Sequence, residues 1–277
     1  MGMRINTNTT SLAAQRSLGK VTQSSANNME KLASGSRINS SSDDAAGLAI
    51  SEQLKADIRS SRQATRNAGD GISMIQTAEG GMNEVSNILV RLRELSVQSA
   101  SDTVGDTERG FSDKEYQNLT KELERISQST EFNGTKLLNG EGDNLDFQIG
   151  INNDEFQDRI QYETGATNVT ASALGVDGSG VASKGDAQDN LEKLDTAISS
   201  VNANRSVLGA LQNRLQSTIS NLEVKTENLS AANSRIRDTD VAEVTANLTR
   251  DNIVKQASVS VLSQANNAQQ GALRLIG

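Results

Sequence analysis

The sequence predicts a mainly α-helical protein: long antiparallel helices in a coiled-coil-like bundle, a small β-hairpin, and helical N- and C-terminal arms that pair. Three observations predict this fold. Apolar residues recur in steps of three, four and seven along two long segments. Aromatic residues make up only 2% of the chain, so the core must be built from small aliphatic side chains, which suit close helix packing. One short segment changes to a period of two, which indicates strands.

The composition excludes several functional classes. The 277 residues include no Cys and no His, which removes disulfides, thiol nucleophiles, Ser-His catalysis and ordinary zinc or haem sites. We therefore expect no enzyme and no cofactor. A net charge of -8, from 27 Lys and Arg against 35 Asp and Glu, disfavours nucleic acid as a partner. No apolar run approaches membrane-spanning length, and the N-terminus lacks the apolar stretch of a Sec signal peptide.

The first element, residues 1–42, reads as an arm that ends in a joint. The stretch "LASGSRINSSSDDAAGLAI" contains adjacent carboxylates at Asp43 and Asp44, whereas calcium loops place their oxygens at alternate positions. Gly35 suits the left-handed residue that ends a helix, and Ser41 with Asp44 fits a capping pattern for a new helix. The stretch therefore predicts a helix stop and restart rather than a cation site.

Two long helices follow from the apolar spacing. The first begins near Asp44 and runs to about Ser101, with its periodic positions at Ala64, Ala68, Ile75, Ala78, Met82, Val85, Leu89 and Leu92. The second, over 186–236, has apolar residues at strict seven-residue intervals: Leu208, Leu215, Leu222, Leu229 and Ile236. A strict seven-residue repeat keeps one edge toward a partner helix. We expect Leu222 and Leu229 to share a core with the Ala68 to Leu92 helix.

Between these helices the chain predicts a third helix and a hairpin. Leu119, Leu123 and Ile126 are spaced for an amphipathic helix, which the turn residues at 133–134 close. Alternating apolar residues from Leu145 to Ile151, and again at 160 and 162, predict a β-hairpin that completes the helical domain over 43–163. The Gly-, Ser- and Thr-rich segment 164–185 reads as an exposed loop.

The C-terminal segment 237–277 mirrors the N-terminal arm. In "SRIRDTDVAE" the seven-residue phase is lost after Ile236, and Asp240 with Glu243 can cap a new helix. The new phase runs through Val254, Val261 and Ala268. Matched breaks in the two arms predict that the arms pair with each other or with copies of the same chain.

Several blocks, in order along nearly the whole chain, resemble the bacterial flagellin family. They include the stretch from 32 to 50, "VRLRELSVQSA", "FNGTKLL", "LGALQNRL" and "NLSAANSRIRDTDVAEVTANLTR". The resemblance implies a secreted, extracellular subunit of the flagellar filament, exported by the flagellar type III apparatus. It also implies a near-minimal form, because only about 22 residues stand where relatives insert large outer domains. Ala268 departs from the family, where many relatives have proline.

The resemblance also implies partners and site residues. The partners are identical subunits in a helical homopolymer, an export chaperone, cap and hook-junction proteins, and a toll-like innate receptor. Subunit packing in the arms would involve Ile5, Leu12, Leu18, Val21, Leu32, Val254, Val261, Leu262 and Ala268. The spoke that links the arms to the helical domain would comprise Ser36, Arg37, Asp43, Asp44, Arg235, Asp238 and Asp240. The receptor contact would involve Arg91, Leu95 and Glu115, which also read as subunit-contact or solvated charges and, for Leu95, as a packing residue.

Other functions compete with a filament subunit: an enzyme, a coiled-coil adaptor, and a cap or junction protein of the same filament system. Missing His and Cys count against the enzyme, and the matched breaks count against an adaptor with one continuous seam. Large aliphatic residues are sparse in both arms. We therefore expect the arms to be disordered in the monomer and to become helical only in the filament.

Overall fold

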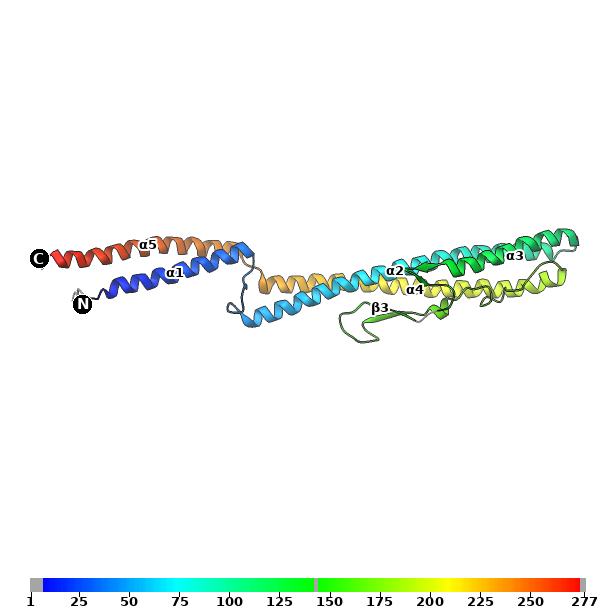
Figure 1. Ribbon diagram of the computed structural model, residues 1–277, viewed down its shortest axis with the longest axis horizontal. Helices are drawn as coiled ribbons and strands as arrows, with labels where there is room; N and C mark the ends of the chain where they lie inside the picture. Colours follow the sequence, from blue (N-terminus) through cyan, green and yellow to red (C-terminus); the bar gives the residue numbers. More distant parts are fainter. Residues whose placement is uncertain (1–6, 142–143, 275–277) are drawn as a thin grey trace. The chain divides into compact units, whose positions relative to one another are not determined.

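The computed structural model describes residues 7–141 and 144–274, and helices dominate it (Figure 1). The helices are α1 (Thr9–Ser34), α2 (Ala45–Ser99), α3 (Asp106–Ser129), α4 (Lys184–Arg237) and α5 (Val241–Arg274), with a short 3-10 helix, η1 (Thr164–Thr167). Two two-stranded antiparallel sheets accompany them: β1 (Glu131–Phe132) with β2 (Thr135–Lys136), and β3 (Leu145–Gln148) with β4 (Arg159–Tyr162). The predicted mainly α fold with a small hairpin is confirmed.

The chain divides into two compact units. One comprises the residues up to Ala56 together with those from Asn228 onward, and the other comprises Asp57–Glu227. Helices α2 and α4 therefore each contribute one part to each unit. The helix break after α1 lies within the first unit, which also includes the beginning of α2.

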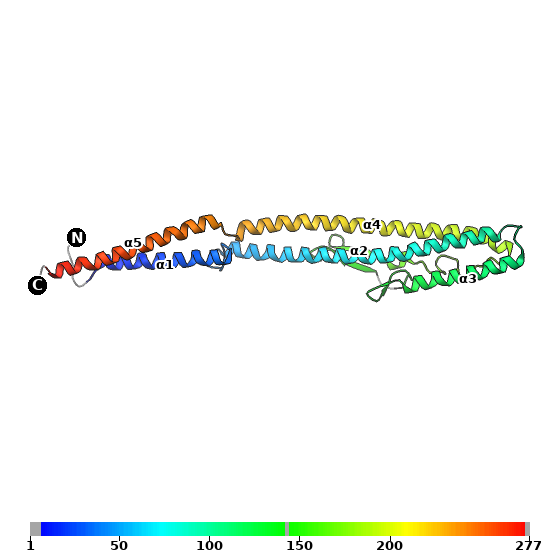
Figure 2. The ribbon, with the colours of Figure 1, turned by 90° about the horizontal axis from the view of Figure 1, so that it is seen from above.

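The core of the second unit lies where α2, α3 and α4 run side by side (Figure 2). The predicted positions of the first long helix are all buried, and those from Ala68 to Leu92 are buried completely. In α4, Leu208 and Leu215 are buried in this core, whereas Leu222 is buried outside it. Leu229 is only half-buried and belongs to the first unit. The expectation that Leu222 and Leu229 share this core is therefore wrong, because the seven-residue repeat continues beyond the end of the shared packing.

The hairpin packs on α2 where that helix carries glycine. Strands β3 and β4 pair in the register Leu145 with Tyr162 and Phe147 with Ile160, as the alternation predicts. A Cβ atom at Gly71 would lie 3.1 Å from the ring of Phe147 and 3.3 Å from Leu215. The missing side chain at Gly71 thus lets the hairpin approach the α2 backbone closely.

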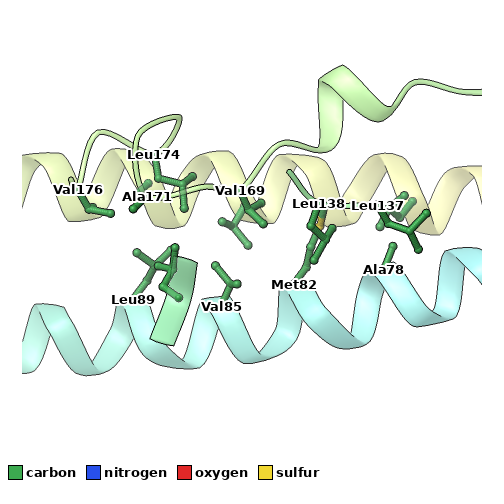
Figure 3. Close-up of a cluster of buried hydrophobic side chains, with 14 of the residues drawn as sticks. Ala78, Met82, Val85, Leu89, Leu137, Leu138, Val169, Ala171, Leu174 and Val176 are labelled. Atoms are coloured by element: carbon green, nitrogen blue, oxygen red, sulfur yellow. The ribbon is translucent and has the colours of Figure 1, made fainter. Parts of the chain in front are cut away.

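Segment 164–185 is not the exposed loop that its composition suggests. Figure 3 shows Val169, Ala171, Leu174 and Val176 gathered with Val85 and Leu89 of α2 in one cluster, and all four side chains are buried. Backbone hydrogen bonds support the segment, including one from the amide of Val169 to the carbonyl of Leu138 at 3.0 Å. Composition misleads here because the Gly, Ser and Thr residues outnumber the aliphatic residues that carry the packing.

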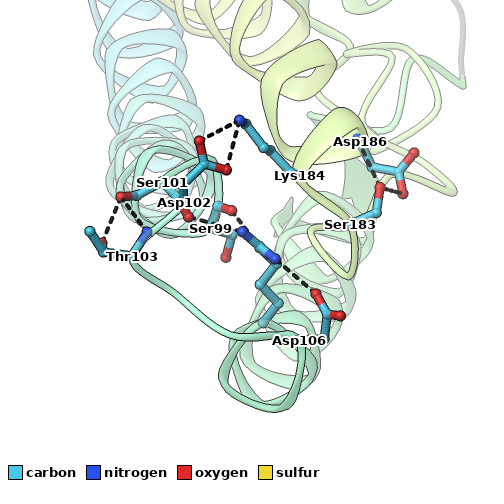
Figure 4. Close-up of polar contacts among 9 residues, drawn as sticks. Ser99, Ser101, Asp102, Thr103, Asp106, Ser183, Lys184 and Asp186 are labelled. Carbon is cyan, nitrogen blue, oxygen red and sulfur yellow. Dashed lines mark hydrogen bonds and ion pairs between the residues drawn. The ribbon is translucent and has the colours of Figure 1, made fainter.

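Arg109 holds the connection between α2 and α3. Its side chain is buried, and it donates from Nε to the carbonyl of Ser99 and from Nη2 to that of Ser101, both at 2.9 Å. It also pairs with Asp106 at 2.8 Å (Figure 4). The guanidinium thus satisfies carbonyls at the end of α2 that have no partner within the helix.

Candidate assembly surface

Helices α1 and α5 lie side by side in the first unit, as both views show. Their shared face is small and largely polar. The buried side chains of α1 are Ser11, Ala14 and Ser25. The two serines each carry one hydroxyl oxygen beyond Cβ, and the alanine carries no heavy atom beyond Cβ. Because apolar burial is the main source of helix-pair stability, this face stabilises the pair only weakly.

Directed hydrogen bonds join the two arms instead. Asp251 is only 6% exposed, and its Oδ2 accepts from Ser24 Oγ at 2.7 Å and from Asn28 Nδ2 at 3.0 Å. Farther along the pair, Ser11 Oγ donates to Asn266 Oδ1 at 3.0 Å. A buried carboxylate is costly unless it is hydrogen-bonded, so Asp251 favours pairing in which its two partners are present.

Several large apolar side chains of this unit face solvent, although Ile38 is buried and others are half-buried. Among the residues that the structure describes, the exposed ones of the first unit are Leu12, Met29, Ile50, Val241, Ile253, Val254, Val259 and Val261. The described residues of the second, larger unit include only six such exposed side chains. Contiguous exposed apolar surface typically marks a protein–protein contact. The arms therefore leave apolar side chains open to solvent that a further protein surface can cover.

The predicted packing residues divide into two groups. Half-buried positions are Leu18, Val21, Leu32 and Leu262, and exposed positions are Leu12, Val254, Val261 and Ala268. The ninth, Ile5, lies outside the described residues. The predicted phase through Val254 and Val261 thus faces away from α1, where a further helix can cover it.

Sequence reasoning missed the α5 face that meets α1. Buried or half-buried positions recur at seven-residue intervals through Val244, Asp251, Ser258 and Ala265. The same spacing was present in the sequence, but two of its members are polar and one is alanine. The sequence pattern therefore favoured the more apolar seven-residue series three positions away, through Val254 and Val261.

The two predicted joints lie side by side and are hydrogen-bonded to each other. Gly35 ends α1 in the left-handed conformation, with φ of 69°, and its carbonyl accepts from the amide of Thr239 at 3.0 Å. Arg37 donates its amide to the carbonyl of Arg237 at 2.6 Å and its Nη2 to that of Ile236 at 2.7 Å. The matched breaks therefore form one paired structure.

Further contacts of the spoke residues strengthen this pairing. Ser36 and Asp238 form an antiparallel β-bridge. Arg237 forms an ion pair with Glu52 on α2, and its hydrogen bond lowers the pKa of the Glu52 carboxyl. Arg235 is exposed. Ser36, Arg37 and Asp238 thus hold the joint, whereas Arg235 projects outward.

The N-cap of α2 is Asp44, not Ser41. Asp44 directly precedes the helix and its Oδ1 accepts from the amide of Gly47 at 2.9 Å, so the expected role of Ser41 is wrong. The neighbouring Asp43 accepts from the amides of Ser40 at 3.0 Å and Asn39 at 3.1 Å. These backbone hydrogen bonds, that from Ser40 first, lower the pKa of Asp43. Both carboxylates organise the joint.

Asp240 caps α5 as the sequence predicts. Its Oδ1 accepts from the amide of Ala242 at 2.9 Å and from that of Glu243 at 3.3 Å. Each side of the paired joint thus begins its next helix with an aspartate, which satisfies amides that have no partner within the helix.

The three residues suggested as a receptor contact do not form one surface. Arg91 pairs with Glu115 at 2.7 Å and with Glu94 at 2.9 Å, and all three side chains are about half exposed. These hydrogen bonds, that from Glu115 first, raise the pKa of Arg91. Leu95, by contrast, is 2% exposed and lies in the core. Leu95 is therefore a packing residue and its assignment to a contact surface is wrong.

Residues 7–141 and 144–274 contain no group of three or more acidic side chains arranged to hold a metal ion. No helix among them is both long and apolar enough to cross a membrane.

Comparisons with known proteins agree with helical regions at both ends of the chain. Residues 5–143 match the family model for the bacterial flagellin N-terminal helical region, and residues 191–276 match that for the bacterial flagellin C-terminal helical region. The chain is 43% identical to a flagellin of Halalkalibacterium halodurans over 274 residues, which cover 99% of this chain and all of that protein.

A filament protein and a solved structure are also similar. The flagellar filament 33 kDa core protein of Treponema phagedenis is 41% identical over 290 aligned positions, covering 99% of this chain and all of that protein. The crystal structure of Bacillus cereus flagellin has 30% identity and a TM-score of 0.51, covering 61% of this chain and 94% of that one. Both terminal helical regions and the near-complete coverage lead to one conclusion: the chain belongs to the bacterial flagellin family.

Proposed function

We propose that this flagellin assembles with identical copies into the helical flagellar filament, the extracellular propeller for swimming, after export by the flagellar type III apparatus. Its role is structural. The observation that carries the proposal is the apolar outer surface of the two arms: side chains such as Leu12, Ile253 and Val261 are exposed although few apolar side chains are buried between α1 and α5.

Copies of the same chain are the natural cover for this surface. Arms that pack against the arms of neighbouring subunits bury the outer faces that α1 and α5 leave open, and each added contact gains roughly 25 cal/mol per Å² of apolar surface. Helices in such an arrangement need no metal, thiol or small molecule. Assembly and the final ordering of the arms then occur as one coupled event.

A substitution in the exposed phase of α5 tests this proposal. Val254 and Val261 lie seven residues apart and both are exposed, so replacing both with Asp should leave the monomer intact and prevent seeded polymerisation. Charged side chains at a buried contact are costly. The matched control replaces the same residues with Leu, which keeps the surface apolar.

Electron microscopy of purified protein after seeding provides the measurement. Long filaments from the unmodified chain and the Leu variant, but none from the Asp variant, support the proposal. Filaments from the Asp variant would contradict the assigned surface. Discrete dimers from the unmodified chain would favour an adaptor, and short assemblies would favour a cap or junction protein.

The remaining partners are suggested by family resemblance alone. An export chaperone and the cap and hook-junction proteins would meet the same arms. A toll-like innate receptor would meet the exposed pair Arg91 and Glu115 without Leu95. Charge reversal of Arg91 and Glu115 together, compared with each alone in a receptor reporter assay, distinguishes a direct contact from a helix ion pair, because the double reversal restores only the ion pair.

A further inference from the structure

The turn of the β3–β4 hairpin presents an exposed phenylalanine. Phe156 is 93% exposed, which is unusual for one of only four phenylalanines in the chain. Asp154 Oδ1 accepts from the amides of Phe156 at 3.0 Å and Gln157 at 2.8 Å, and Asp158 Oδ2 accepts from the amide of Asp154 at 3.1 Å. The turn is therefore held in place, so burying the ring against a partner costs little ordering of the backbone.

A groove on the outer face of α2 offers a complementary surface in the same unit. Val90, Val97, Arg93, Glu94 and Gln98, all on α2, line a shallow groove that is largely open to solvent, with a volume of about 520 Å³. The two valines are about half exposed, at 46% and 51%. Two apolar side chains on the exposed face of a helix form a floor that an aromatic ring can cover.

The charged lining of this groove also suits an aromatic ring. Arg93 Nε is bound to Asp195 Oδ1 at 2.6 Å, which holds the guanidinium at the groove. A fixed guanidinium plane can stack on an aromatic face. An arginine side chain is cationic across the physiological range, and the hydrogen bond with Asp195 raises the pKa of Arg93 further.

Phe156 cannot enter the groove of its own chain. Asn67 Nδ2 donates to the carbonyl of Gln148 at 3.0 Å, which places β3 beside Asn67. The groove is centred near Glu94, on the order of 40 Å farther along α2 at the rise of an α-helix. The hairpin turn also points away from the α2–α3 connection (Figure 1). Only another molecule can bring the two surfaces together.

We propose that Phe156 of one subunit inserts into the Val90–Val97 groove of the next subunit. The contact joins two different surfaces of the same chain, and such head-to-tail contacts generate open helical assemblies rather than closed dimers. The proposal rests on the filament function proposed above, and it names one contact between the second units of neighbouring copies.

Disulfide cross-linking in assembled filaments tests the contact directly, because the chain contains no cysteine. A Glu155→Cys/Val97→Cys variant, polymerised and then oxidised, should give a ladder of covalent multimers, since each subunit is linked to the next. Each single variant should give no ladder. The matched control is Glu155→Cys/Gln128→Cys, which places the second thiol at an exposed position of α3. A ladder no stronger than that of this control, or dimers alone, would overturn the proposal.

A second comparison uses the two exposed phenylalanines. Phe156→Ala should raise the critical concentration for polymerisation at least about tenfold, whereas Phe111→Ala, at a position 65% exposed, should not. Thermal unfolding of both monomers should match that of the unmodified chain. If all variants form filaments with the same critical concentration, the contact is wrong and the filament function stands. If the unmodified chain forms no filaments on seeding, the proposed function fails and the contact fails with it.

Discussion

Two adjacent glycines in α2 have different roles. A Cβ atom at Gly81 would lie 2.7 Å from Leu138 Cδ1 and 2.7 Å from Thr130 Oγ1, whereas one at Gly80 would meet nothing within 4 Å. The missing side chain at Gly81 therefore allows the segment after α3 to approach the helix. Gly80 only adds conformational freedom to the unfolded chain.

Alanine at these two positions should change stability in opposite directions. Gly80→Ala should stabilise the protein by about 0.5–1 kcal/mol, because alanine favours the helix. Gly81→Ala should destabilise it by about 1–3 kcal/mol, because Leu138 and Thr130 must move. Thermal unfolding followed by circular dichroism measures both. Equal stabilisation by the two substitutions would mean that residues 130–138 do not pack closely on α2.

The two tyrosines give a pH-dependent signal. Tyr116 and Tyr162 are buried, and the chain has no Trp and no other Tyr. Burial raises the pKa of Tyr116 to about 12 and also raises the pKa of Tyr162. Because the folded-state pKa lies above the unfolded value of about 10, the neutral phenols stabilise the fold below pH 10, and this stabilisation is lost as the pH rises through about 12.

Alkaline titration should therefore show ionisation and unfolding together. Phenolate absorbance should rise in one cooperative step that coincides with the loss of helical circular dichroism. Free tyrosine serves as the reference for unperturbed ionisation. Phenolate formation near pH 10 with the helices intact would show that the two rings are accessible to solvent.

At the scale of elements, the seven-residue repeat of α4 passes from one unit to the other. Leu208, Leu215 and Leu222 are buried in the second unit, whereas Leu229 is half-buried in the first. The repeat is uniform in sequence, but its members contact different surroundings. Replacing leucine with alanine should consequently lower the free energy of unfolding by different amounts at different positions of α4.

Leu215→Ala should destabilise the second unit by about 2–5 kcal/mol, the usual cost of removing a fully buried leucine. Leu229→Ala should cost clearly less in the monomer, because Leu229 is already partly exposed. Thermal unfolding of the two variants gives the comparison. An equal loss of stability for both would place Leu229 in a core as dense as that around Leu215.

Long helices were predictable from sequence because their apolar spacing extends over many turns. The period, the caps at Gly35 and Asp240, and the β3–β4 hairpin all follow from local patterns. Burial of segment 164–185 did not follow, since its few aliphatic residues pack through tertiary contacts that leave no regular spacing. The same applies to Asp251, whose hydrogen bonds to α1 depend on residues more than two hundred positions away.

The candidate site was predictable in outline rather than in detail. Matched breaks at the two joints predicted arms that pair, and the structure places Arg37 and Arg237 in direct contact. Leu95 was misplaced because its motif resembles a family block, and such a resemblance gives no information on burial. Phe156 carried no sequence signal, since a single aromatic residue in a polar turn has no period.

At the scale of the whole molecule, the two units are stabilised by different interactions. The second unit buries an extended aliphatic core, whereas the first relies on the α1–α5 pair and the hydrogen-bonded joint. Isolated helices gain most of their stability from packing of an apolar face. The arms should therefore be stable in the filament and mostly unfolded in the monomer.

Limited trypsin digestion of monomer and filament tests this coupling most directly. Brief treatment of the monomer should cleave near Arg37 and Arg237 and leave a stable middle fragment. Filaments should resist tryptic cleavage near Arg37 and Arg237, because neighbouring subunits cover the arms. Monomers whose ends are as protected as their middle would contradict the claim that the arms fold only on assembly.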